Sequence, residues 1–296
     1  METKTRSVRA ILAIVILLLP ISVVLSTNYF SSSPNLAGGQ PERPLPVLLI
    51  HGYRSTHNVW EEWVDWLGNY GIEAKAVSFE DDPTTTAVNE DECGSAEDNA
   101  AQLNQLVRNF KEESGSEKIN IVTHSKGGLD ARLYLANNPL SDDVANLIMI
   151  GTPNEGSPLA DRYYLRDDCK PAVYDLMTTS PVLRVEKNEH TAYYTIASNW
   201  ISVYGFNVPS WWDPFWWVGE DINCPNPSIW FDLQGWNFLA FQYSGRNEIP
   251  GPDDGIVPVD SVEEPGEFTS LGSTDNCHTN MFTEEEFDKA LAILLE

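Results

Sequence analysis

The sequence predicts an α/β fold in which a mostly parallel sheet carries helices on both faces. From residue 46 onward, short apolar segments alternate with amphipathic segments, which is the pattern of repeated strand–helix–strand units. The first apolar segment, residues 47–50, reads VLLI without a polar residue. An uninterrupted apolar run of this length is typical of a parallel strand buried on both faces.

Short apolar runs bounded by glycine or polar residues predict the strands of this sheet. They are residues 47–50, 72–79, 119–122, 146–150, 193–197 and 256–259. The last of these, IVPV, follows Asp254 and Gly255 directly. Connections between the strands are expected to be right-handed crossovers.

Amphipathic spacing and capping residues predict the helices between the strands. Residues 59–67 place their apolar side chains at helical intervals, and a second helix is expected to begin after Ser95, a favourable N-cap. A third helix is expected from residue 127 to about residue 137. Near the C-terminus, Thr283 and Glu286 have the spacing of a capping box, which predicts a final helix.

Residues 1–26 have the features of an export signal, because basic residues precede an apolar run over residues 10–25. The run is shorter than the about 20 residues that a membrane span needs, and Pro20 interrupts it. A signal peptide and an N-terminal membrane anchor both fit this pattern. Either way, we expect the protein to be extracytoplasmic, secreted or anchored. Residues 27–45, rich in Ser, Pro and Gly, predict a flexible linker before a single domain over residues 46–296.

The charge balance excludes one class of partner. The chain has 18 basic and 44 acidic residues, which give a formal net charge of −26. Nucleic acid is therefore not expected as a partner, because phosphate binding requires clustered Lys and Arg. An acid excess of this kind is typical of a solvated surface.

The four cysteines indicate disulfides, since exported proteins meet an oxidising compartment. Four cysteines allow three pairings, and the sequence leaves all three open. Cys277 adjoins His278, and we expect it to pair with Cys224, which leaves Cys93 to pair with Cys169. No C-x-x-C pair is present, so no zinc site is expected.

Residues 199–250 depart from the strand–helix pattern and hold seven of the ten tryptophans. One interpretation is a subsidiary core beneath a long loop. The other is an apolar cap or lid over an active site, which would suit an acyl chain or contact with a lipid surface.

Ser125 lies in the segment IVTHSKGGLDAR, which predicts a strand, a tight turn and a helix. A nucleophile elbow has the form G-x-S-x-G, and here Thr123 replaces the first Gly while Gly127 keeps the second. A small residue at the first position keeps side chains clear of the strained turn, and Thr is small enough. Taken alone, the segment fits either a nucleophile elbow centred on Ser125 or an ordinary strand-to-helix turn that carries a serine.

A serine nucleophile requires a base and an acid that orients the base. His278 precedes the final predicted helix, and the GPDDGIVPVDS segment offers Asp253, Asp254 and Asp260 between Ser125 and His278. Asp254 is the preferred acid, because it is expected where a loop enters the sheet; Asp275 competes less well.

Two backbone N–H groups are needed to stabilise an oxyanion. The residue after the nucleophile, Lys126, supplies one. The loop after the first strand, HGYRS, would supply the other from Tyr53, with Gly52 allowing close approach of the backbone. A loop, a serine, an acid and a histidine therefore occur in the order expected for acyl transfer.

The segments PVLLIHGY, VTHSKGGLDAR, MIGTPNEGSPLAD and DDGIVP resemble those of triacylglycerol lipases and related esterases of the α/β-hydrolase superfamily. The resemblance extends over about residues 46–296. It implies an α/β-hydrolase fold with an aromatic-rich cap insertion.

The resemblance also implies a serine carboxylic-ester hydrolase with Ser125 as nucleophile, Asp254 as acid and His278 as base, and with Tyr53 and Lys126 as oxyanion donors. It implies lipid or other ester substrates and no cofactor. Some bacterial members hold calcium with an Asp after the catalytic His, but Thr279 and Asn280 stand here, so no metal is expected. Thioester hydrolysis, acyl transfer to an alcohol and non-catalytic binding on the same fold are the alternatives.

Overall fold

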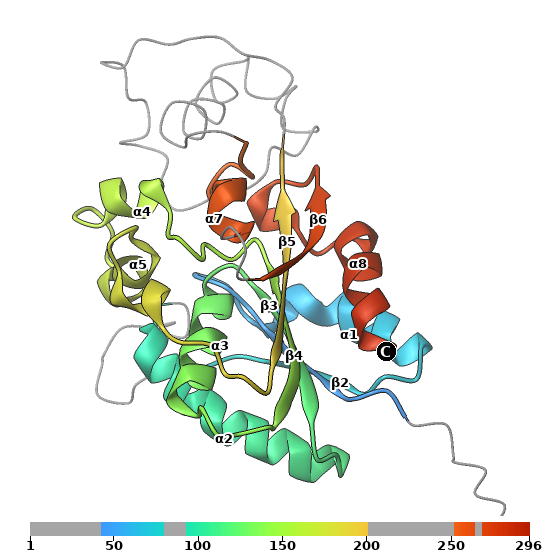
Figure 1. The fold of residues 1–296 in the computed structure, drawn as a ribbon. Helices are drawn as coiled ribbons and strands as arrows, with labels where there is room; N and C mark the ends of the chain where they lie inside the picture. Colours follow the sequence, from blue (N-terminus) through green and yellow to red (C-terminus); the bar gives the residue numbers. More distant parts are fainter. Residues whose placement is uncertain (1–42, 80–92, 201–251, 264–267) are drawn as a thin grey trace, which may run out of the picture. The chain divides into compact units, whose positions relative to one another are not determined.

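The computed structural model describes residues 43–79, 93–200, 252–263 and 268–296. Within these residues a single six-stranded sheet has the order β2-β1-β3-β4-β5-β6, and all neighbouring strands are parallel. The predicted α/β class is therefore confirmed (Figure 1). The predicted signal or anchor, most of the linker, the proposed cap and Cys224 fall outside the described residues.

Five of the six predicted strands are confirmed, with shifts of a few residues at their ends. The strands are β1 Val47–Ile50, β2 Ala74–Val77, β3 Ile119–His124, β4 Val144–Ile150, β5 Ala192–Ser198 and β6 Thr269–Thr274. Strand β6 was not predicted, because its TSLGST sequence is polar and contains Gly272. Its burial is low, as is common for the last strand at the edge of a sheet.

The predicted strand at residues 256–259 is wrong. The Asp254 carboxylate accepts the N–H groups of Ile256 and Val257, and Pro258 has no N–H to donate. These are the donors that a strand would have offered to a neighbour. The segment forms a turn with one isolated bridge between Asp253 and Pro258 and then enters a short helix.

The four predicted helices are confirmed, and the described residues also contain three short α-helices and three 3-10 helices. The α-helices are α1 Glu61–Asn69, α2 Ala96–Ser114, α3 Lys126–Asn137, α4 Pro158–Tyr163, α5 Lys170–Leu176, α7 Val259–Glu263 and α8 Glu284–Leu294; the 3-10 helices are η1 His57–Trp60, η3 Pro181–Arg184 and η6 His278–Asn280. Both predicted caps are confirmed, because Ser95 accepts the Asp98 N–H and Thr283 and Glu286 form the capping box. Among the described residues, no helix is both long enough and apolar enough to span a membrane.

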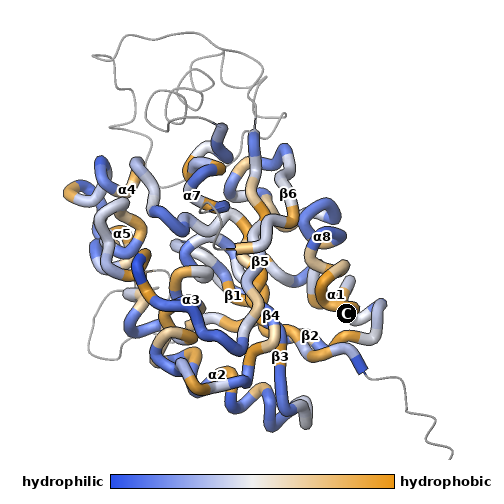
Figure 2. Tube along the Cα trace, viewed as in Figure 1, coloured by the Kyte–Doolittle hydropathy of each residue, from blue (hydrophilic) through white to orange (hydrophobic). Residues whose placement is uncertain are grey.

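Two hydrophobic clusters cover the two faces of the sheet. Along β1, Leu48 and Ile50 pack with side chains of α2 and α3, whereas Val47 and Leu49 pack with those of α1 and α8. Successive strand residues point to opposite faces, so the unbroken VLLI run serves both clusters. Full burial of one such side chain stabilises the fold by roughly 1.5–3 kcal/mol. The hydrophobic strands at the centre of the domain are visible in Figure 2.

Candidate active site

Ser125 occupies a sharp turn between β3 and α3. Its backbone has φ 54° and ψ −130°, a conformation that residues other than Gly rarely adopt. The Ser125 N–H donates to the Ile150 carbonyl at the end of β4, 2.9 Å away, which anchors the turn to the next strand. Strain of this kind costs about 1–3 kcal/mol and persists only where the surroundings fix it.

The glycines after Ser125 allow the start of α3 to lie against two loops. A Cβ added at Gly127 would lie 2.3 Å from the His51 carbonyl oxygen, and one at Gly128 would lie 2.1 Å from the Thr152 hydroxyl oxygen. Both distances are far below contact, so neither position accepts a larger residue without movement of the chain. Thr123 is fully buried in β3 and is accommodated there.

Ser125, His278 and Asp254 form a continuous hydrogen-bonded chain. The Ser125 Oγ lies 2.8 Å from His278 Nε2, and His278 Nδ1 lies 2.7 Å from Asp254 Oδ2. All three residues are buried. With the proton on Nδ1, the imidazole donates to Asp254, and Nε2 is then free to accept the Ser125 hydroxyl proton.

The loop after β4 fixes the position of Asp254. This loop contains the GTPNEGS sequence, and its Ser157 hydroxyl donates to the Ile256 carbonyl at 2.7 Å. Its Asn154 amide donates to the Val262 carbonyl, also at 2.7 Å. Asp254 Oδ1 accepts two backbone N–H groups, at 2.9 Å from Ile256 and 2.7 Å from Val257. The carboxylate is therefore held on both oxygens.

His278 is held through its backbone as well as its ring. Its N–H donates to the Asp254 carbonyl at 2.9 Å. His124 lies 2.8 Å from the His278 carbonyl through Nε2, and the two rings are 4.8 Å apart. Burial lowers the pKa of His124 well below its usual value, so its ring is neutral and donates from Nε2. This role could not be predicted from the sequence, since the adjacency of His124 to Ser125 indicates only that its side chain points away from the serine.

The two predicted oxyanion donors belong to segments that meet at Ser125. Lys126 follows the serine directly, and a Cβ added at Gly52 would lie 2.7 Å from the Ser125 Cβ. Tyr53 is the next residue in that loop. Among the described residues, neither the Tyr53 nor the Lys126 N–H has a hydrogen-bond acceptor. The arrangement leaves both groups available to a bound oxygen.

The Lys126 side chain is buried in a network that the sequence did not reveal. Its Nζ lies 2.6 Å from Asp130 Oδ1 and 3.8 Å from Asp175 Oδ2. Asp130 also accepts from the Asn99 amide, and Asp175 accepts from the Ala96 N–H. The spacing of four between Lys126 and Asp130 was the available signal, because such pairs share one face of a helix. The network joins the elbow to α2 and α5.

The predicted disulfide between Cys93 and Cys169 is present, with a Cα–Cα distance of 4.8 Å. Cys277 is also disulfide-bonded, and its predicted partner Cys224 lies outside the described residues. Among the described residues, Asp167, Asp168 and Cys169 are the only grouping of potential metal ligands. The Cys169 sulfur is in the disulfide and both carboxylates pair with Arg54, so this set has no free thiolate to offer a metal.

Two relatives in sequence are triacylglycerol lipases. The chain is 34% identical over 125 residues to a triacylglycerol lipase of Pseudomonas fragi, a match that covers 40% of this chain and 38% of that protein. It is 31% identical over 131 residues to a triacylglycerol lipase of Pseudarthrobacter phenanthrenivorans, covering 39% of this chain and 35% of that protein. The matched segment thus spans just over a third of these relatives' length.

Solved structures share the fold. The mature form of a Bacillus licheniformis lipase aligns with 86% of this chain and 93% of that chain, at 21% identity and a TM-score of 0.57. The propeptide form of the same lipase aligns with 86% of this chain and 51% of that chain, at 22% identity and a TM-score of 0.60. At this low identity, the structural likeness shows that the chain has the α/β-hydrolase fold and nothing further.

A family model gives the more extensive match in sequence. The model described as palmitoyl protein thioesterase matches residues 46–208, which is more than half of the chain. This range includes β1, the serine elbow and the GTPNEGS loop. The protein therefore belongs to the palmitoyl protein thioesterase family, within the α/β-hydrolases.

Proposed function

We propose that the protein is a serine hydrolase that cleaves acyl esters through a Ser-His-Asp triad. The observation that supports this most is the unbroken chain of short hydrogen bonds from Ser125 through His278 to Asp254. An ordinary strand-to-helix turn does not require a serine in a strained conformation that faces a buried, oriented imidazole. The lipase relatives support acyl esters as the substrate class.

In the first half of the proposed reaction, Ser125 Oγ attacks the acyl carbonyl carbon while His278 Nε2 takes the hydroxyl proton. Asp254 stabilises the imidazolium that forms, and the N–H groups of Tyr53 and Lys126 stabilise the oxyanion. Collapse of the tetrahedral intermediate breaks the bond to the leaving group, which receives the proton from His278. An acyl-enzyme on Ser125 remains.

In the second half, water attacks the acyl-enzyme and gives its proton to His278. The second tetrahedral intermediate expels Ser125 Oγ, the proton returns to the serine, and the carboxylic acid leaves. His278 accepts and then returns each proton in the scheme, so the scheme requires no cofactor.

Thioester cleavage is a second candidate, and the match to the palmitoyl protein thioesterase model favours it. The same triad would act on the thioester carbonyl, and a thiol would leave in place of an alcohol. Rates with oxygen esters and thioesters of the same acyl chain separate the two candidates. Product analysis with a competing alcohol present would show acyl transfer.

Ser125→Ala tests the proposal directly. We expect it to abolish p-nitrophenyl ester turnover, because the nucleophile is lost, and to leave the melting temperature nearly unchanged. Wild-type protein should form a covalent adduct with a fluorophosphonate probe, and the variant should not. Activity retained by the variant would refute the nucleophile assignment, and absence of labelling of the wild type would favour a non-catalytic binding protein.

We further propose that the reaction takes place outside the cytoplasm. Support comes from the basic and apolar N-terminal sequence and from the Cys93–Cys169 disulfide, which an oxidising compartment maintains. Contact of the tryptophan-rich cap with lipid stays a prediction. An ester chain-length series, measured with and without an emulsified interface, tests it.

A further inference from the structure

Backbone strain at the active site is not confined to the nucleophile. Among the described residues, only Ser125 and Arg54 combine a side chain with a positive φ, and Arg54 has φ 49°. Arg54 directly follows Tyr53 in the loop after β1. Such strain persists only where the surrounding contacts fix it, and it gathers at functional sites. The contacts that hold Arg54 are therefore informative.

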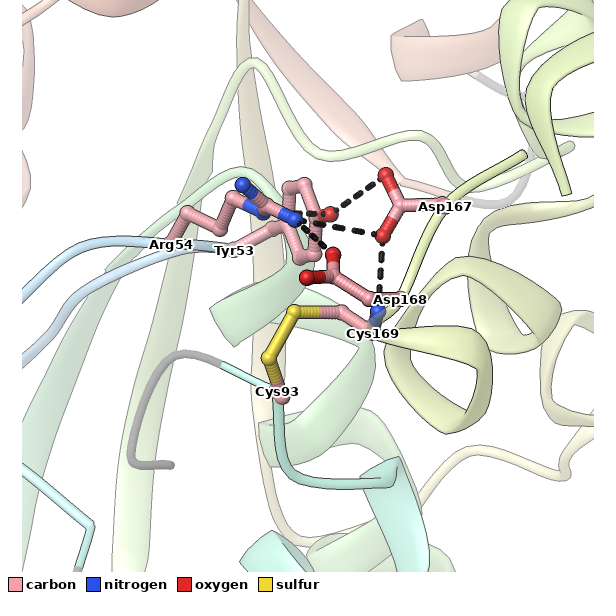
Figure 3. The surroundings of a disulfide bond; sticks show 6 residues. All are labelled: Tyr53, Arg54, Cys93, Asp167, Asp168 and Cys169. Carbon is pink, nitrogen blue, oxygen red and sulfur yellow. Dashed lines mark hydrogen bonds and ion pairs between the residues drawn. A yellow bond between two sulfur atoms is a disulfide. The ribbon is translucent and has the colours of Figure 1, made fainter. Parts of the chain in front are cut away.

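Arg54 and Tyr53 are both held by the same carboxylate (Figure 3). The Tyr53 hydroxyl donates to Asp167 Oδ2 at 2.8 Å and accepts from Arg54 Nε at 2.8 Å. An Arg54 terminal nitrogen lies 3.4 Å from Asp167 Oδ1 and also pairs with Asp168. These bonds form a network in which the Tyr53 hydroxyl both donates and accepts.

Asp167 is itself anchored to a covalent crosslink. Its Oδ1 accepts the Cys169 N–H at 2.8 Å, and Cys169 is joined to Cys93 by the disulfide. Cys169 precedes α5 directly, and Cys93 lies just before α2. The carboxylate is thus fixed by a segment that cannot move freely.

The network acts on the loop that approaches the nucleophile. Gly52, one residue before Tyr53, is so close to Ser125 that an added Cβ would lie 2.7 Å from the Ser125 Cβ. Because Tyr53 is joined directly to Gly52, a shift of the Tyr53–Arg54 segment also moves the Gly52–Tyr53 peptide, which carries the Tyr53 N–H. Misplacement of reacting groups by about 1 Å can cost about 100-fold in rate.

We propose that Asp167 is a positioning residue that holds the Tyr53–Arg54 segment in its strained conformation and so aims the Tyr53 N–H at the oxyanion. The proposal rests on the function proposed above. In this proposal, the Tyr53 side chain, the Arg54 side chain and the disulfide all stabilise the loop after β1 that carries the oxyanion donor. Asp167 itself does not contact the substrate.

The test is Asp167→Ala, with Asp143→Ala as the matched control. Asp143 is also a partly exposed aspartate with a basic partner, Lys111, but it precedes β4 at the opposite end of the strand from the active-site loops. The side chains of Asp167 and Asp143 are 21% and 29% exposed. Loss of one ion pair affects both variants alike, so only a positioning role separates them.

We expect kcat of Asp167→Ala for a p-nitrophenyl ester to fall about 10- to 100-fold, with KM changed less than about twofold. The inhibition constant of a trifluoromethyl ketone should rise in parallel, because its hemiketal oxygen uses the same N–H groups. Asp143→Ala should keep wild-type values of both. Tyr53→Phe, which removes one hydroxyl and keeps the backbone N–H, should lower kcat in the same manner and serves if Asp167→Ala does not fold.

Wild-type kcat and ketone affinity in folded Asp167→Ala, or in Tyr53→Phe, would overturn the proposal. So would a loss of kcat equal to that of Asp143→Ala. Ser125→Ala in the same assay separates failure of the positioning role from failure of the proposed function. If Ser125→Ala is inactive while Asp167→Ala keeps wild-type kcat, only the positioning role fails. If Ser125→Ala is active, the proposed function itself fails.

Discussion

Arg54 and Ser125 show how single residues keep unfavourable conformations at this site. Each has a positive φ, and each is fixed by contacts with distant segments. For an L-residue, the left-handed conformation costs roughly 1–2 kcal/mol, whereas Gly adopts it readily. The strain and the side-chain contacts of Arg54 can therefore be separated by substitution.

Arg54→Ala and Arg54→Gly should differ in the free energy of unfolding. Both lose the pairs with Asp167 and Asp168, but only Ala retains the cost of the positive φ, so Arg54→Gly should be more stable by about 1 kcal/mol. Urea denaturation of both variants measures this. At Arg108, inside α2, the order should reverse, because Gly disfavours a helix by about 1 kcal/mol relative to Ala. The same order at both positions would contradict the interpretation.

At the residue scale, Ser125, His278 and Asp254 could be predicted as a triad from their order along the chain, and the fold brings the three side chains together. The contacts of His124 and Asp167 could not be predicted. Their partners are the His278 carbonyl and the Tyr53 hydroxyl, which are 154 and 114 positions away in sequence. Contacts over such separations leave no local pattern, so only the fold reveals them.

Among the secondary-structure elements, α5 carries a carboxyl with unusual pH dependence. Burial raises the pKa of Asp175 from 3.8 to about 6, although Lys126 and the Ala96 N–H favour the charged form. The folded state therefore binds this proton more tightly than the unfolded chain. The contribution of this tighter proton binding to the free energy of unfolding is complete below about pH 4. It is lost as the pH rises to about 6.

Asp175→Asn should remove this dependence. Between pH 4 and pH 6, the free energy of unfolding of the variant should rise relative to that of the wild type, by up to about 3 kcal/mol. Urea denaturation of both proteins at pH 4, 5, 6 and 7 provides the measurement. Asp142→Asn, at a side chain that is 67% exposed, is the matched control for the substitution itself. Parallel curves for Asp175→Asn would show that burial of this carboxyl has no such effect.

Elements with a strong local pattern were predictable, and elements set by tertiary contacts were not. The apolar run of β1 and the caps of α2 and α8 lie in the local sequence. By contrast, β6 is polar and pairs only because β5 lies beside it. The segment after Asp254 resembles a strand, but the Asp254 carboxylate takes the N–H groups that a strand would use.

At the scale of the whole molecule, the Cys93–Cys169 disulfide closes a loop with a sequence separation of 76. A crosslink over such a loop restricts the unfolded chain and stabilises the fold by about 4 kcal/mol in the chain-entropy description. The double substitution Cys93→Ala and Cys169→Ala should lower the free energy of unfolding by about that amount, as measured by guanidinium denaturation. A loss below about 1 kcal/mol would show that the crosslink constrains the unfolded chain little.

The distance along the chain between Ser125 and His278 also has a consequence for biosynthesis. The two residues are 153 positions apart. During translation, the proposed nucleophile is made long before its proposed base. A nascent or truncated chain that ends before His278 would thus carry the serine elbow without its proposed base, so the proposed hydrolysis requires both segments.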